Sequence, residues 1–515
     1  MDHVLSALIG IGGFLLAFGL AVFIHELGHF LAAKMFKVPV ERFVIGFDKD
    51  AMPFMPRCIW EKEIGGTIYG LALVPLGGYV KMTGTIHPEI EKYLDDKDAE
   101  KEAKKSKDGA QAEEPVAATH DDEAVNKVSR ASLTGQAMID QGALYRKPFW
   151  QKTIIYSAGV FMNLVLAAAI LTVQAVKGQY VDAPLPAVVG WQAPGSFLTA
   201  QGILEGDRLT AVNGTPVETN EDYWKVLGEV SQSLPEDEEE ARQSVVTLAM
   251  TFERGGETFE KTLEVPWKSG EKEPTPLDDI ASLISRPAYV EYAIQNRPAY
   301  KAGIRRGDTI TDVDAEPVND WGELVHILRG SLGKSLDVKV DRAGETLAFT
   351  LKPMESTEED GVGQIGIVAG NPEKVRYSIP FSQAIVQSPV LVYENTIRYV
   401  LNLKKIGGRL LHGEINKVRQ DLGGPVAIAQ MAGYHANLGF DDFLRFLVML
   451  NIALAVMNLL PYPVLDGGHI VLAAWEAVFR APMSPKILVP VFNWGLISLL
   501  VFVVLVTLSD FIKMF

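Results

Sequence analysis

Cysteine is nearly absent from this sequence of 515 residues, in which Cys58 is the single example. One thiol cannot close a disulfide within the chain, even where part of the chain faces an oxidising compartment. The sequence therefore excludes a fold held by internal disulfides.

Basic residues are also scarce, since 48 Lys and Arg stand against 64 Asp and Glu, for a net charge of −16. No basic footprint of the kind that binds nucleic acid is visible, so we expect no nucleic-acid partner. The length, with 48% hydrophobic and 22% charged residues, favours several modules over one core.

Charge is missing altogether from three long stretches, at residues 4–24, 153–176 and 487–508. Each is long enough to cross a bilayer, which takes about 20 apolar residues. A fourth stretch, 446–460, is apolar apart from Asn451 and Asn458, and it can span the bilayer if the apolar residues just before it are included. We expect four spans. The first is not expected to be a signal peptide, because residues 1–3 lack a basic n-region.

The few basic residues near the ends of these spans predict the orientation. Basic residues near span ends mark the cytoplasmic loops. The sequence therefore places residues 177–442 and both termini outside the cytoplasm, and Cys58 inside. The residues that carry this argument are Lys34, Lys37, Arg42, Arg146, Lys147, Lys152, Arg480 and Lys486.

His25, Glu26 and His29 follow directly on the first apolar run, in the spacing H-E-x-x-H. Residues four apart share one face of a helix, so both imidazoles can reach one metal ion while the glutamate lies beside a metal-bound water. Ionisable side chains cost about 2.5 to 3.5 kcal/mol each within a span and usually serve function there. The pattern indicates a zinc protease that cuts peptide bonds within the membrane.

A third metal ligand is needed, because a catalytic zinc normally takes three protein ligands and leaves one position for water. Asp466 is a candidate at the end of the third span, where prolines break the helix and Gly467 and Gly468 let the backbone bend closely. His469 competes with it, and the residues alone leave both open.

The region that we expect to lie outside the cytoplasm contains an internal repeat. The string from Gly202 to Val217 recurs from Gly303 to Val318 with the same spacing of Gly-Ile, Gly-Asp and Pro-Val. A period of about a hundred residues indicates a duplicated domain and not a short-repeat array. The two copies resemble PDZ domains of membrane and periplasmic proteases, which bind extended peptides or chain ends by strand addition. The alternative is that they act only as rigid spacers or plugs.

Two other regions have a distinctive composition. Residues 89–127 are strongly charged and almost free of aromatic residues, so we expect a solvated or disordered insertion, with partner binding as the alternative. Residues 383–420 mix apolar residues with Arg398, Lys404, Lys405 and Arg409, which indicates amphipathic helices near the membrane.

Taken together, these motifs resemble the site-two protease family, specifically the bacterial branch that carries two PDZ domains and regulates sigma-factor signalling. The likeness covers nearly the whole chain. It rests on the His25 to His29 motif, on the Leu465-Asp466-Gly467 string with the preceding Asn458, and on the tandem repeat. It also rests on residues 75–82 and on Gly423-Gly424-Pro425.

The resemblance implies roles for individual residues. His25, His29 and Asp466 would bind Zn²⁺, and Glu26 would be the general base. Residues 63–82 would form a β-hairpin that dips into the membrane and holds an unwound substrate. Residues 158–163 match the family pattern in the second span except that Val160 replaces the usual proline, and their glycine and asparagine could instead be a packing pair. The residues implied to bind substrate are Asn458, Gly159, Asn163, Gly77, Gly78 and Tyr79.

The resemblance also implies a fold class, an α-helical polytopic membrane protein with four transmembrane helices, a membrane-associated β-hairpin and two inserted α+β PDZ domains. The expected segments are a first transmembrane helix at 1–36, a cytoplasmic-side loop and membrane-reentrant β-hairpin at 37–85, a charged insertion at 86–148, a second transmembrane helix at 149–178, PDZ domains at 185–268 and 286–354, amphipathic membrane-proximal helices at 380–440, a third transmembrane segment at 441–470 and a fourth transmembrane helix at 485–512.

The activity implied is that of an intramembrane zinc endopeptidase in the lipid bilayer of a bacterial inner membrane, with its active site toward the cytoplasm and its PDZ domains outside. Its substrates would be single-span membrane proteins, such as anti-sigma factors already trimmed on the outside or signal-peptide remnants. The PDZ domains would filter substrates by size or bind peptide ligands. The rival classes are a catalytically silent membrane scaffold and a zinc transporter or storage protein.

Overall fold

The computed structural model describes residues 2–49, 55–73, 77–85, 90, 93–94, 97, 142–232, 244–266, 276–356 and 361–514. Most of the charged insertion expected at 86–148 lies outside these described residues. The two roles considered for it, a solvated segment and a partner-binding segment, therefore stay predictions. The chain divides into two compact units. The first contains residues 1–177 with 378–513, and the second contains residues 178–377.

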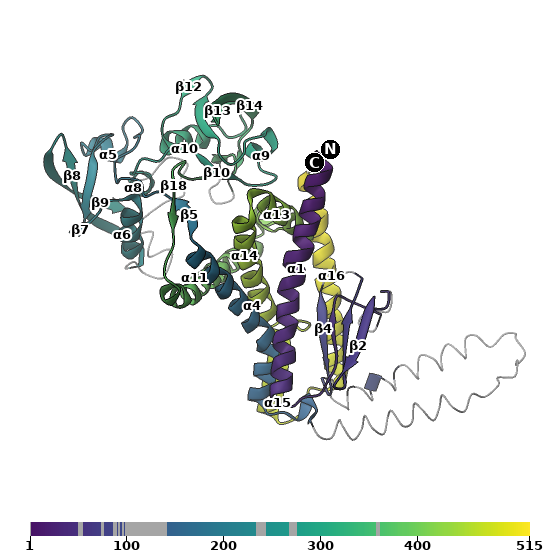
Figure 1. Ribbon diagram of the computed structural model, residues 1–515. Coiled ribbons are helices and arrows are strands. Elements are labelled where there is room, and N and C mark those ends of the chain that lie inside the picture. The colour runs from purple at the N-terminus through teal and green to yellow at the C-terminus, as the bar shows by residue number, and fades with distance from the viewer. Residues whose placement is uncertain are drawn as a thin grey trace, which may run out of the picture. The chain divides into compact units, whose positions relative to one another are not determined.

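The first unit is built on four long helices, α1 (Asp2–Met35), α4 (Phe149–Lys177), α14 (Phe440–Leu459) and α16 (Pro485–Met514). Each contains a stretch long and apolar enough to cross a membrane, so the structure has four candidate spans, as the sequence predicts. Figure 1 shows α1, α4 and α14 packed side by side. Small residues allow this packing. Ala17 and Ala21 of α1 are fully buried, as is Ala167 of α4.

In the described part of the chain this unit also contains α11 (Phe381–Leu411), α12 (Ile415–Asp421), α13 (Pro425–Leu438) and α15 (Asp466–Phe479). The segment expected as one span at 441–470 thus contains all of α14 but its first residue and the start of α15, separated by residues 460–465. On α11 the buried residues Ala384, Ser388 and Val392 recur every four positions, whereas large apolar side chains elsewhere on the helix are exposed. This is the pattern of an amphipathic helix.

The start of α13 explains the Gly423-Gly424-Pro425 motif. The carboxylate of Asp510, near the end of α16, accepts hydrogen bonds from the backbone N–H groups of Gly424 and Ala427 at 3.1 and 3.0 Å. A Cβ atom on Gly424 would lie 2.7 Å from Oδ2 of Asp510, so only glycine allows this approach. Asp510 is buried, and its charge is placed at the positive end of a helix.

A four-stranded sheet lies between α1 and α4 in the sequence. Its strands are β1 (Val40–Ile45), β2 (Trp60–Ile64), β3 (Thr67–Leu71) and β4 (Gly78–Met82), in the order β2-β3-β1-β4. The prediction of a single hairpin over residues 63–82 is therefore wrong, because β3 and β4 are not neighbours in this sheet. β3 pairs with β2 and with β1, and among the described strands β4 pairs with β1 alone. The physical reason is β1, whose buried Val40, Phe43 and Val44 take the central place in the sheet.

A charged cluster lies beside this sheet. Arg42 forms ion pairs with the buried Asp48 and with Glu61, and Tyr79 donates a hydrogen bond of 3.0 Å to Asp48. Cys58 also donates to Asp48, at 3.3 Å. Burial, this hydrogen bond and the negative charges of Asp48 and Glu61 together raise the pKa of the Cys58 thiol to about 12. Cys58 is therefore protonated and unreactive at neutral pH.

The second unit contains the repeat, and its two copies have the same topology. In the first, β6 (Arg208–Val212), β7 (Thr215–Pro216), β8 (Val245–Arg254) and β9 (Glu257–Pro266) pair in the order β7-β6-β8-β9. In the second, β11 (Thr309–Val313), β12 (Glu316–Pro317), β13 (Leu336–Arg342) and β14 (Glu345–Leu351) pair in the order β12-β11-β13-β14. The helices are α5 (Phe197–Ala200) and α6 (Asn220–Gln232) in the first copy and α9 (Pro298–Ala302) and α10 (Trp321–Arg329) in the second.

The repeated Gly-Asp pair has the same structural task in both copies. Asp207 is buried, accepts a hydrogen bond from the N–H of Leu204, and pairs with Arg254 at the end of β8. Asp308 does the same with Arg305 and with Arg342 at the end of β13. In each copy a buried carboxylate therefore ties the turn before the central strand to the neighbouring strand.

Shorter elements complete the second unit. Strands β5 (Gln179–Asp182) and β18 (Lys374–Tyr377), its first and last, pair with each other, and β10 (Val290–Ala293) pairs with β17 (Ile367–Ala369). The remaining elements are α8 (Pro276–Ala281), β15 (Met354–Glu355) and β16 (Gly363–Gln364). The core of the first copy also includes Ile280, Leu283 and Ile284, and that of the second includes Ile365. Both cores thus extend past the ends expected at 268 and 354.

Candidate metal centre

Two imidazoles project from one face of α1. His25 and His29 lie one helical turn apart, both are less than a tenth exposed, and their Nε2 atoms are 3.2 Å apart. The spacing of four residues places both side chains on one face of the helix. The structure thus brings the two nitrogen atoms to one point.

Asp466, the first residue of α15, brings a carboxylate to the same point. Its Oδ2 atom lies 3.0 Å from Nε2 of His25 and 3.4 Å from Nε2 of His29. The two glycines after it make this possible. A Cβ atom on Gly467 would lie 2.2 Å from the carbonyl oxygen of Leu459, and one on Gly468 would lie 2.1 Å from that of Tyr462. Without side chains, the first turn of α15 folds back against the end of α14.

The three atoms fit a divalent metal ion. Tetrahedral zinc with bonds of about 2.0 to 2.1 Å holds neighbouring donor atoms about 3.3 Å apart. The measured separations of 3.0, 3.2 and 3.4 Å match this edge length. Oδ2 of Asp466 is buried and has no hydrogen-bond partner within the described part of the chain. A metal ion would satisfy this atom, which is otherwise costly to bury.

The outer nitrogen atoms of the two rings have partners on α4. Nδ1 of His29 donates a hydrogen bond of 2.8 Å to the carbonyl oxygen of Ile155, which leaves its Nε2 lone pair free for a metal. Nδ1 of His25 lies 3.4 Å from the side-chain nitrogen of Asn163, whose Oδ1 atom is buried and has no hydrogen-bond partner among the described residues. Metal binding through Nε2 places a hydrogen on Nδ1, and a half-turn of the Asn163 amide lets Oδ1 accept it.

Gly159 explains how α4 comes so close. A Cβ atom there would lie 2.5 Å from Nε2 of His29 and 2.7 Å from Nε2 of His25, in the space of the metal ligands themselves. Gly28 of α1 faces the same crossing, because its Cβ would lie 2.3 Å from the carbonyl oxygen of Ala158. The structure thus places Gly159 and Asn163 directly behind the histidines.

Glu26 lies next to the edge strand β4. A Cβ atom on Gly78 would meet the side chain of Glu26 at 3.1 Å and that of Val22 at 3.4 Å, so the strand lies directly against α1 at this point. Gly77 has a φ of +121° and would clash with Phe47 if it carried a side chain. The glycines therefore bring backbone N–H and C=O groups close to Glu26.

Three other predicted site residues lie elsewhere around the centre. The hydroxyl of Tyr79 is bonded to Asp48, as described above. Asn458 is half-buried in the last turn of α14. His469 stacks on Tyr156 with ring centroids 5.0 Å apart and also contacts Phe492. Its ring therefore has aromatic neighbours on α4 and α16, and the group of three potential ligands contains Asp466 and not His469.

Two features escaped the sequence-based predictions. The carbonyl oxygen of Ile155 has no sequence signal, since any residue supplies one. A second group of potential ligands, Asp48, Cys58 and Glu61, also lies within 4.8 Å, but Arg42 pairs with both carboxylates. This second group is therefore a salt-bridge cluster.

Comparisons with known proteins place this geometry in context. A family model described as peptidase family M50 matches residues 13–502. Regulator of sigma-E protease RseP of Escherichia coli strain K12 is 30% identical over 525 residues, which cover 99% of this chain and 100% of that protein. RseP of Salmonella typhimurium strain 14028s is 29% identical over 524 residues with the same coverage. Regulator of sigma E protease of Haemophilus influenzae is 27% identical over 518 residues, again with 99% and 100% coverage.

We expect that replacing any one of the three donor residues by alanine abolishes zinc binding, because each would supply one of three protein ligands. The measurement is zinc per mole of purified folded protein for His25→Ala, His29→Ala and Asp466→Ala. His469→Phe is the matched control, since it keeps an aromatic ring on Tyr156 and should retain the metal. Full zinc in Asp466→Ala together with loss in His469→Phe would assign the third ligand to His469.

Proposed function

The chain belongs to peptidase family M50, the site-two protease family, and is a membrane metalloprotease; on this premise we propose that it cuts single-span membrane proteins within the bilayer. The observation that carries the proposal is the triangle of Nε2, Nε2 and Oδ2 atoms at the end of a span, with Glu26 between the two histidines. His25, His29 and Asp466 would hold the zinc.

The chemistry divides between the metal and the chain. Bound zinc would acidify a water molecule and polarise the scissile carbonyl group. Glu26 takes the proton from the attacking water and passes it to the leaving amine nitrogen. The Ile155 carbonyl and Asn163 keep the two imidazoles oriented, so we assign positioning roles to Gly159 and Asn163 and not substrate contact.

A helical substrate must be unwound before it is cut, because its carbonyl groups are engaged in hydrogen bonds. We propose that β4 holds the unwound segment as an added strand. It lies at the edge of its sheet, next to Glu26 through Gly78, which supports this role. The backbone at Gly77, Gly78 and Tyr79 would pair with the substrate, and Asn458 would donate to its carbonyl oxygen.

The two copies in the second unit we assign as PDZ domains that filter substrates by size. They contain none of the three donor residues, so their expected effect is to restrain cleavage. The curated relatives are named as regulators of sigma-E, and we infer that the substrates here are likewise anti-sigma-factor-like proteins, first trimmed on the outside, or remnants of signal peptides.

We further propose a bacterial inner-membrane location, with the metal centre toward the cytoplasm and the second unit outside. The support is the basic bias of the loops. Residues from two of those loops, Lys147 and Arg480, line one cavity, so these loops end on the same side of the first unit.

Glu26→Gln should retain zinc and lose peptide-bond cleavage, because the amide keeps the shape of the side chain but cannot take a proton. The loss expected from removing a general base is on the order of a hundred- to ten-thousandfold. Zinc content and cleavage of a membrane substrate are measured on the same preparation, with Asp466→Ala as the variant that loses both. Wild-type cleavage by Glu26→Gln would contradict the assignment of Glu26 as general base, whereas a zinc-loaded wild-type chain that cuts nothing would favour a scaffold or a zinc store.

The orientation can be tested with introduced cysteines in a Cys58→Ser chain, since the native thiol is too weakly acidic to report access. Lys62→Cys lies on the exposed strand β2, and Thr258→Cys is exposed on β9. A membrane-impermeant maleimide should label Thr258→Cys in intact cells and Lys62→Cys only after the membrane is opened. The opposite labelling would show that the orientation is reversed. It would also contradict the proposal that the second unit filters substrates outside the cytoplasm.

The filter is tested by loosening both PDZ domains through Asp207→Ala and Asp308→Ala, which remove the buried carboxylates of the two Gly-Asp turns. The intact enzyme should cut only the trimmed form of a substrate, and the loosened variant should cut the long form as well. Glu260→Ala with Glu316→Ala, both exposed in the same sheets, is the matched control. A zinc-loaded variant that cuts neither form would show that the domains recruit substrate.

A further inference from the structure

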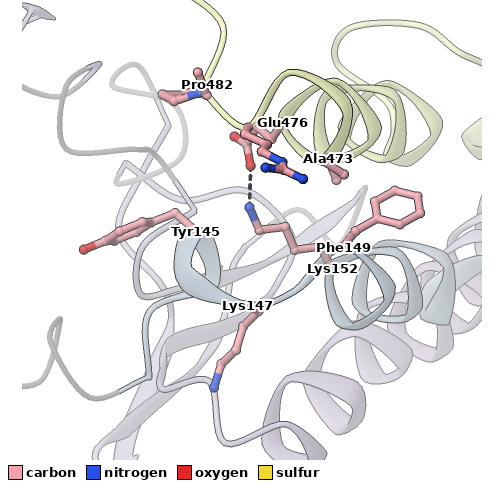
Figure 2. Close-up of a pocket in the computed structure, with 10 residues that line it drawn as sticks. Tyr145, Lys147, Phe149, Lys152, Ala473, Glu476 and Pro482 are labelled. Carbon is pink, nitrogen blue, oxygen red and sulfur yellow. Dashed lines mark hydrogen bonds and ion pairs between the residues drawn. The ribbon is translucent and has the colours of Figure 1, made fainter.

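A cavity of about 260 Å³ in the first unit is lined by none of the three proposed metal ligands (Figure 2). Its walls come from two parts of the chain that are far apart in sequence. One is the segment that leads into α4, and the other is the last turns of α15 with the residues that follow. The residues that matter here are Tyr145, Lys147, Phe149, Lys152, Glu476 and Arg480.

The cavity is positively charged although the chain as a whole carries a charge of −16. Lys152, less than a tenth exposed, forms an ion pair with Glu476 across the cavity, as Figure 2 shows. This pair uses the one carboxylate of the lining. Lys147 and Arg480 have no carboxylate partner within ion-pair distance among the described residues. Both residues line the cavity, so among the described residues its basic side chains outnumber its one carboxylate.

Exposed aromatic side chains surround this end of the unit. Phe149 is 42% exposed, and its neighbour Trp150 is 54% exposed. On α15, Trp475 and Phe479 are exposed as well, with ring centroids 4.0 Å apart. Aromatic side chains exposed where a span ends are typical of the boundary between lipid and water. A cavity with such neighbours is expected at the depth of the lipid headgroups.

We propose that this cavity binds the phosphate group of an anionic phospholipid. Lys147 and Arg480 would contact the phosphate, the Lys152–Glu476 pair would form the floor, and the aromatic side chains would contact the glycerol and the acyl chains. Basic pockets at the ends of membrane helices bind such headgroups. A soluble phosphate ion shares the same chemistry, but the aromatic border favours the lipid.

Such a lipid would matter to the metal centre. Lys147 precedes α4, which carries Gly159 and Asn163, and Arg480 ends α15, which begins with Asp466. A headgroup that contacts both cations would tie together the two helices that meet at the zinc ligands. The site is independent of the proposed proteolysis, so its test does not require activity.

The experiment measures lipid binding to the purified full-length chain by native mass spectrometry, with phosphatidylglycerol, phosphatidylcholine and inorganic phosphate as separate probes. The test variant is Lys147→Gln with Arg480→Asn. Arg480 has a φ of +53°, a left-handed conformation that asparagine tolerates better than most residues. Lys152 is left in place, because it is the buried partner of the pair and its removal would leave Glu476 without this ion pair. Lys486→Gln is the matched control, because Lys486 is an exposed lysine in the first turn of α16 that does not line the cavity.

We expect one phosphatidylglycerol to bind at least about tenfold more tightly than phosphatidylcholine, a preference that two surface cations can supply. The double variant should lose this preference, and the control should keep it. Equal affinity for the two lipids would overturn the proposal, as would an unchanged preference in the double variant. Displacement of the lipid by millimolar inorganic phosphate would instead assign the cavity to a soluble anion.

Discussion

The close crossing of α1 and α4 is the constraint on which the metal centre depends. Gly28 and Gly159 leave no side chains between the two backbones, so the imidazoles of α1 lie directly against α4. Only at this distance can the carbonyl oxygen of Ile155 and the amide of Asn163 reach the outer nitrogen atoms of the histidines. Small residues at helix contacts are common within membranes, where no hydrophobic force drives helices together. Here the same contact also orients a chemical site.

Local patterns in the sequence were enough to predict much of this. The four spans follow from composition alone, and His25 with His29 follows from helical geometry, because both depend only on residues close together in the chain. The recurring Gly-Asp pair likewise marked two structural copies, because each pair makes the same turn. Asp466 required the resemblance to a known family, since nothing local says that it lies near residue 25.

Contacts between distant segments were not predictable in the same way. The place of β1 between β3 and β4 depends on a pairing choice that the pattern of residues 63–82 does not contain. The ion pair of Lys152 with Glu476 joins residues from two helices, and Lys152 alone indicated only which side of the membrane its loop faces. The roles of individual glycine residues were also ambiguous in the sequence. Gly159 matched a family pattern, but its task became clear only from the atoms that a Cβ would displace.

The ligands of the proposed zinc site come from opposite ends of the chain, at positions 25, 29 and 466 of 515. During synthesis the first two enter the membrane long before α15 exists, and two nitrogen atoms alone hold zinc weakly. The centre is therefore completed only when the last helices are made. An unfinished or truncated chain would have both histidines in the membrane, and yet it would not cleave neighbouring membrane proteins. The order of the sequence itself delays the hydrolytic activity until the surrounding fold can control it.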